Sequence, residues 1–129
     1  MSNNYFEVVR AGINSTFQDK GRSNLYHIGI PFSGVMDKRN FFLSNKLVGN
    51  QLDAPVIEFA YQGPLLKYHG NNINFSITGD VIFKLRNKNG EIEGNCYESY
   101  QLEDEDEIDI ITTKKSVYGY LSISAEFDI

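Results

Sequence analysis

Apolar side chains recur at every second position through much of the chain beyond Asn50. The runs Ile73–Ile77 (INFSI) and Val81–Leu85 (VIFKL) both follow this pattern. A period of two places successive side chains on opposite faces of an extended strand, so each run predicts a strand with one buried face. The alternation therefore favours a mainly β domain.

Turn-forming residues separate these runs and suggest hairpins. Thr78–Asp80 lies between the first two runs, and Asn87–Gly90 predicts a second hairpin because Asn and Gly tolerate the positive φ of tight turns. Extended structure resumes at Glu91–Ile92. So many short strands predict a sandwich or a barrel. Further strands are expected at Phe6–Val9, Val56–Ala60, Leu65–Tyr68, Cys96–Leu102, Ile108–Thr112 and Tyr118–Ala125.

One short helix is predicted between Asp37 and Val48, about residues 37–48, because its apolar side chains are spaced to form one stripe. Asp37 or Ser33 can accept the amide hydrogens of its first turn, and Gly49 suits the left-handed residue after its last turn. No repeat, linker or low-complexity segment divides the sequence. We expect residues 1–129 to form a single domain.

Charge and composition narrow the class of protein. Twelve basic and 17 acidic residues give a net charge of −5, with no Lys/Arg-rich face, which disfavours nucleic acid and anionic membranes as partners. No apolar run reaches the roughly 18 residues that span a bilayer. The single cysteine, Cys96, cannot close a disulfide within the chain, and the first residues do not resemble a signal peptide. We expect a cytoplasmic protein.

Metal and nucleotide motifs are not evident. His27, His69 and Cys96 have no recognisable metal-ligand spacing, so no metal site is predicted. The acidic run Glu103–Glu107 lacks the alternating ligands and central glycine of a calcium loop, and a solvated turn between two strands explains it better. The sequence contains no GxxxxGK[ST] loop for phosphates.

Two segments carry candidate binding residues, each with a structural alternative. In Gln18–Arg22 (QDKGR), Arg22 is able to bind a carboxylate or phosphate, or to form a local ion pair with Asp19 that fixes the turn. Ser33–Asp37 (SGVMD) precedes the predicted helix, where backbone N–H groups favour an anion. Its Ser and Asp suit a substrate contact and a base or orienting group, and they suit helix capping equally well.

These segments belong to an ordered series of short motifs. The series runs through Ala11-Gly12, Ser15–Asp19, Gly21-Arg22, Gly29–Pro31, Ser33-Gly34, Asp37, Ser44–Asn50, Glu58 and Gly63–Leu65. In this order and spacing it resembles the start of the biotin-dependent carboxyltransferase family. That family includes allophanate hydrolase subunit 2, the C-type subunit of 5-oxoprolinase, the antagonist of a sporulation-kinase inhibitor, and part of urea carboxylase, and is also called urea amidolyase-related.

The resemblance implies a fold and a set of site residues. Family members have two halves that look like cyclophilin-type β-barrels, and this chain resembles the first half only. Relatives usually have a Gly-Gly pair where this chain has Ala125-Glu126. The substrate-binding residues implied near the cleft between halves are Gln18, Asp19, Arg22, Ser33, Gly34, Asp37, Asn45, Asn50 and Glu58.

The resemblance also implies a function within a complex. The expected activity is that of an ATP-dependent hydrolase or carboxyltransferase acting on a small amide such as 5-oxoproline, urea or allophanate. ATP is expected for the complex, together with either carboxybiotin or a phosphorylated amide, and no cofactor is expected on this chain alone. The expected partners are a B-type companion subunit similar to allophanate hydrolase subunit 1, and a C-terminal half or a second copy. The alternative is a non-catalytic regulatory module that docks on a companion.

Overall fold

The computed structural model describes residues 4–11 and 36–124. Within these ranges the chain forms nine strands and one helix. In chain order they are β1 (Tyr5–Arg10), α1 (Lys38–Leu47), β2 (Ile57–Ala60), β3 (Leu65–His69), β4 (Ile73–Thr78), β5 (Val81–Asn87), β6 (Gly90–Glu93), β7 (Ser99–Leu102), β8 (Glu107–Thr113) and β9 (Tyr118–Ile123).

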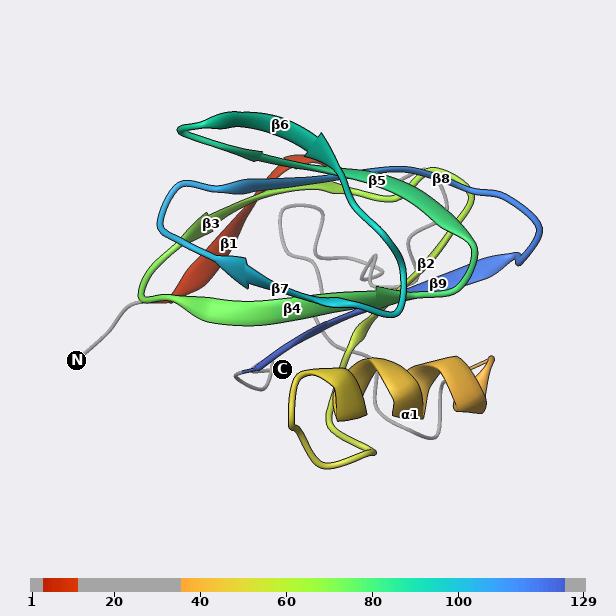
Figure 1. The fold of residues 1–129 in the computed structure, drawn as a ribbon. Coiled ribbons are helices and arrows are strands. Elements are labelled where there is room, and N and C mark those ends of the chain that lie inside the picture. Colours follow the sequence, from red (N-terminus) through yellow and green to blue (C-terminus); the bar gives the residue numbers. More distant parts are fainter. Residues whose placement is uncertain (1–3, 12–35, 125–129) are drawn as a thin grey trace, which may run out of the picture.

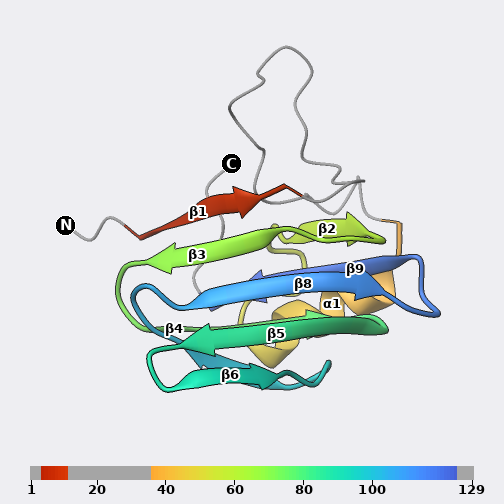
Figure 2. The same ribbon diagram turned by 90° about the horizontal axis from the view of Figure 1, so that it is seen from above.

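The strands pair into two antiparallel sheets, one above the other (Figure 1). The five-stranded sheet has the order β1-β3-β8-β5-β6, and the four-stranded sheet has the order β2-β9-β4-β7. Helix α1 lies on the outer side of the four-stranded sheet, whereas the five-stranded sheet faces the viewer in Figure 2. The predicted mainly β class with one short helix is confirmed. The described strands form two separate sheets and do not close into one barrel.

The hydrophobic core lies between the two sheets. Phe75 and Ile77 of β4 and Phe83 of β5 are fully buried and meet Ile110 of β8 and Leu121 of β9. Burying an apolar side chain of this size stabilises the fold by roughly 1.5–3 kcal/mol. The period of two in the sequence correctly identified these core positions of β4 and β5.

Both ends of helix α1 have the capping residues that the sequence predicts. The side chain of Asp37 accepts a hydrogen bond from the amide of Asn40, which makes Asp37 the N-cap. At the other end, the amide of Gly49 donates to the carbonyl of Lys46, and that of Asn50 donates to the carbonyl of Asn45. This pair of bonds needs a left-handed residue, and Gly49 has a φ of 81°.

Two predicted strands extend more than one residue beyond the strands of the structure. The strand expected at Cys96–Leu102 begins only at Ser99, because Tyr97 has a φ of 66° and interrupts the extended backbone. Its amide donates instead to the carbonyl of Ile77 at 2.8 Å. The last strand, expected at Tyr118–Ala125, ends at Ile123, and Ala125 itself lies outside the described residues.

The acidic run Glu103–Glu107 forms the turn between β7 of one sheet and β8 of the other. Its first three residues are exposed, as predicted, but Asp106 is buried. The Asp106 carboxylate accepts a hydrogen bond from the amide of Glu103 at 2.8 Å, and burial raises its pKa. The carboxylate of Asp104 accepts a hydrogen bond from the amide of Gly70. Two of the acidic side chains therefore shape the turn.

Candidate functional site

Four of the nine predicted site residues fall in the described ranges: Asp37, Asn45, Asn50 and Glu58. The other five, Gln18, Asp19, Arg22, Ser33 and Gly34, lie outside the described residues, as does His27.

A buried carboxylate lies beneath the start of α1. Glu58 of β2 is 1% exposed and is directly opposite Tyr120 of β9, which is fully buried. The Tyr120 hydroxyl donates to Glu58 Oε2 at 2.5 Å, and the amide of Met36 donates to the same oxygen at 2.9 Å. The amide of Asp37 donates to the Tyr120 oxygen at 2.8 Å. We call Met36, Asp37, Glu58 and Tyr120 the helix-start cluster.

The strand register explains why these groups meet. In β2 and β9 every second side chain faces α1, and the pairing of Glu58 with Tyr120 places the two on that face. Phe41, Val56 and Tyr120 form a small apolar cluster beside them. A hydrogen bond is electrostatically stronger in such apolar surroundings than in water. The cluster is therefore a fixed polar centre at the base of the helix.

The Tyr120 phenol keeps its proton at any ordinary pH. Burial raises its pKa well above the usual range for tyrosine, and the hydrogen bond to Glu58 raises it further, against a smaller opposing effect of the Asp37 amide. The hydroxyl is thus a permanent donor to the carboxylate.

Asp37 serves the helix directly. Its Oδ1 accepts from the amide of Asn40 at 3.2 Å, and its Oδ2 accepts from the side-chain amide of Asn40 at 2.9 Å. The capping role predicted for this residue is confirmed. Met36, immediately before it, is 66% exposed, so the cluster reaches the surface at this residue, whereas Glu58 and Tyr120 are buried.

Asn45 and Asn50 belong to a second group, toward the C-terminal end of α1. The buried Asn45 amide nitrogen donates to the carbonyls of Leu52 at 3.0 Å and Ala54 at 2.7 Å. Its oxygen accepts from the Asn50 side chain at 3.3 Å and lies 3.2 Å from the hydroxyl of Ser122. Both amide hydrogens of Asn45 are thus used inside the fold, and its oxygen faces two donor groups.

The second group attaches α1 to the four-stranded sheet. Asn50 also donates to the carbonyl of Ile123 at 2.6 Å, and Ser122 donates to the Ser44 hydroxyl at 2.7 Å. Ser76 donates to the carbonyl of Ser44 at 2.8 Å. We call Ser44, Asn45, Asn50, Ser76 and Ser122 the asparagine network.

The structure therefore divides the four described site residues into two pairs. Asp37 and Glu58 share the helix-start cluster, whereas Asn45 and Asn50 share the asparagine network. Tyr120 and Ser122 are the partners that sequence reasoning missed. Both lie in a predicted strand at alternate positions, which indicated a common face but not the residues opposite them.

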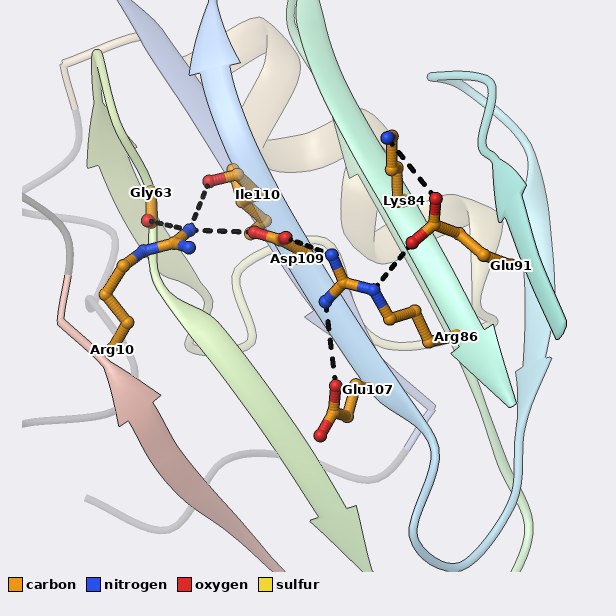
Figure 3. A network of polar contacts seen from close by, with 8 residues as sticks. All are labelled: Arg10, Gly63, Lys84, Arg86, Glu91, Glu107, Asp109 and Ile110. Atoms are coloured by element: carbon orange, nitrogen blue, oxygen red, sulfur yellow. Dashed lines mark hydrogen bonds and ion pairs between the residues drawn. The ribbon is translucent and has the colours of Figure 1, made fainter. Parts of the chain in front are cut away.

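A third polar group lies on the outer face of the five-stranded sheet (Figure 3). Asp109 of β8 binds Arg10 at 2.8 Å and Arg86 at 2.7 Å, and Arg86 also binds Glu91 at 2.7 Å. Arg10 reaches Asp109 because a β-bulge between Val8 and Arg10 changes the register of β1 against β3. This network links four strands of the sheet and was not predicted.

Replacing Asp109 with Asn is expected to lower the free energy of unfolding by about 2 kcal/mol at pH 7, since hydrogen bonds to charged groups contribute roughly 1.5–3 kcal/mol each. Burial raises the pKa of Asp109, but hydrogen bonds from Arg10 and Arg86 outweigh it, and the net pKa is lowered. A lowered pKa stabilises the fold above the unfolded value of about 3.9, and this contribution is lost as the pH falls through the folded value. Urea unfolding of both chains should therefore converge as the pH falls below about 3.9.

Glu91→Gln is the matched control for Asp109→Asn, because the Glu91 side chain in the same network is 43% exposed. Exposed ion pairs contribute little to stability, so this control should unfold close to the wild type. If both substitutions lowered the free energy of unfolding equally, Asp109 would not be the main stabilising group of this network.

Among the described residues, no group of three or more His, Cys, Asp or Glu side chains is arranged to hold a metal ion. The described part of the chain also contains no helix long and apolar enough to cross a membrane.

The fold and the helix-start cluster define a two-sheet β domain with a covered carboxylate beneath its helix. The family model for the carboxyltransferase domain, subdomains A and B, matches residues 28–129. The chain belongs to this carboxyltransferase-domain family.

Individual relatives agree with this family. The chain is 42% identical to urea amidolyase from Lachancea kluyveri over 77 residues, 59% of the chain and 4% of that protein. It is 30% identical to the C-type subunit of 5-oxoprolinase from Haemophilus influenzae over 113 residues, 88% of the chain and 35% of that protein. The crystal structure of Kluyveromyces lactis urea carboxylase superposes with a TM-score of 0.72 at 31% identity, covering 92% of this chain and 10% of that one. The chain thus spans a minor part of each relative.

Proposed function

We propose that the chain is part of an ATP-dependent complex that hydrolyses or carboxylates a small amide such as 5-oxoproline, urea or allophanate. The match to the carboxyltransferase-domain model over residues 28–129 carries this proposal. The names of the relatives, urea amidolyase and 5-oxoprolinase, support the substrate class. We place the complex in the cytoplasm, because a single cysteine suits a reducing compartment.

The site is proposed to hold an anionic carboxyl or phosphate group beside the start of α1. We infer that Arg22 or the segment Ser33–Asp37 contacts this group, that Asp19 orients Arg22, and that Glu58 fixes the helix start from below. The hydrogen bonds of Glu58 to Met36 and Tyr120 support the last role.

The chain alone is expected to be inactive. This chain covers only part of the relatives it matches, so groups from elsewhere are expected to complete the site. Without them the reacting atoms are not held in position, and a misplacement of about 1 Å can lower the rate roughly a hundredfold. The sequence lacks a GxxxxGK[ST] phosphate loop, so we assign ATP to a B-type companion subunit. The remaining site groups are expected from a C-terminal half or a second copy.

Reconstitution with a B-type companion subunit tests the proposal. ATP hydrolysis should rise when 5-oxoproline, urea or allophanate is added to the complex, and neither chain should respond alone. Tight binding to the companion without turnover of any of the three amides would contradict the proposed enzymatic activity and indicate a regulatory module.

In that complex, replacing Arg22 with Ala should abolish turnover while the free energy of unfolding stays nearly unchanged. A guanidinium group that binds a carboxyl or phosphate of the substrate contributes to the reaction and little to the fold. Thermal unfolding and turnover are measured on the same preparation. A loss of stability equal to the loss of activity would show that Arg22 forms a structural pair with Asp19.

A further inference from the structure

The hydroxyl of Tyr120 has only one possible arrangement of its proton. The amide of Asp37 can only donate, so the phenol oxygen accepts that hydrogen bond. Its single proton is then directed at Glu58 Oε2. The amide of Met36 donates to the same Oε2, so this oxygen receives two donors and carries no proton of its own.

The Tyr120 ring is held rigidly. It is fully buried and forms one apolar cluster with Phe41 of α1 and Val56, the residue before β2. Packed interiors leave little room for a side chain to change its rotamer. The hydroxyl is thus a fixed point on β9 that joins β2 to the first turn of α1.

We propose that Tyr120 is a positioning residue of the site: its hydroxyl fixes the Glu58 carboxylate and the Met36–Asp37 backbone in one geometry, and it acts without touching the substrate. This inference rests on the proposed function, because it names the residue that aligns the helix start at which the anionic group is proposed to bind. Tyr120 belongs to none of the sequence motifs that indicated the site.

Tyr120→Phe tests the inference, because it removes the hydroxyl and keeps the ring. Tyr118→Phe is the matched control. Tyr118 faces the same side of β9 and packs against the same apolar cluster, but its hydroxyl has no hydrogen-bond partner among the described residues.

The first measurement is hydrogen exchange of backbone amides by NMR on the full chain. In Tyr120→Phe, the amide of Asp37 should exchange at least tenfold faster than in the wild type, whereas that of Asn50 at the other end of α1 should be unchanged and report an intact fold. Tyr118→Phe should leave both unchanged. Unchanged exchange of Asp37 in Tyr120→Phe overturns the inference.

The second measurement is turnover of the reconstituted complex. Misalignment of the helix start should lower kcat at least tenfold in Tyr120→Phe with little change in KM, and Tyr118→Phe should match the wild type. Equal kcat for the two variants overturns the positioning role. A wild-type complex without turnover would refute the proposed function, and the exchange of Asp37 would still decide whether Tyr120 fixes the helix start.

A third measurement needs no variant. In the wild-type chain the Tyr120 hydroxyl proton should give a resolved NMR signal protected from exchange with water, with a cross-peak to the amide proton of Asp37. Absence of such a signal in the folded chain contradicts the hydrogen-bonded arrangement.

Discussion

Replacing Asn45 with Ala is expected to lower the free energy of unfolding by about 3 kcal/mol. Asn45 is fully buried, donates two hydrogen bonds and accepts one from Asn50, and its oxygen also faces the Ser122 hydroxyl. Removing one partner of a buried hydrogen bond costs roughly 1–3 kcal/mol for each group that is left unpaired. The carbonyls of Leu52 and Ala54 lose their side-chain donor, so this part of the loop after α1 is no longer bound to the Asn45 side chain. Urea unfolding followed by circular dichroism measures the change.

Asn72→Ala is the control for this substitution, because Asn72 is exposed and precedes β4. Surface substitutions of this kind usually change stability by less than about 0.5 kcal/mol. If Asn45→Ala has the same free energy of unfolding as the control while the reconstituted complex loses turnover, the main role of Asn45 is in substrate binding. Its hydrogen bonds in the asparagine network would then contribute little to stability.

The alternation of apolar residues was sufficient to predict most of the fold. A period of two specifies both the strand and its buried face, as Phe75 and Ile77 show, and the caps at Asp37 and Gly49 specified the helix. Tyr97 shows the limit of such patterns. A left-handed tyrosine is held there by contacts with Ile77, Gly79 and Asn40, which are distant in the sequence.

The candidate site depended on pairings that local sequence does not encode. Glu58 and Tyr120 are 62 residues apart and meet only because β2 and β9 are adjacent in one particular register. A shift of one residue would turn either side chain into the core. The motif series indicated Glu58, Asp37, Asn45 and Asn50, but it gave no reason to separate them into two groups.

Replacing Glu58 with Ala is expected to lower turnover of the reconstituted complex about a hundredfold and to lower the free energy of unfolding by about 3 kcal/mol. The substitution leaves the Tyr120 hydroxyl and the Met36 amide without the oxygen they share. Both donors lie against the first turn of α1, so the helix start loses its support as the fold weakens. Turnover and urea unfolding are measured on the same complex.

Glu58→Gln separates position from charge, because its side-chain carbonyl can still accept from both Tyr120 and Met36. If Glu58 acts by holding the helix start, the Gln variant should recover most of the stability and keep turnover within about tenfold of the wild type. Glu98→Gln, at an exposed position, controls for the loss of one negative charge. A Gln variant that is stable yet as inactive as Glu58→Ala would mean that the negative charge or the second carboxylate oxygen, both of which Gln lacks, takes part in the reaction.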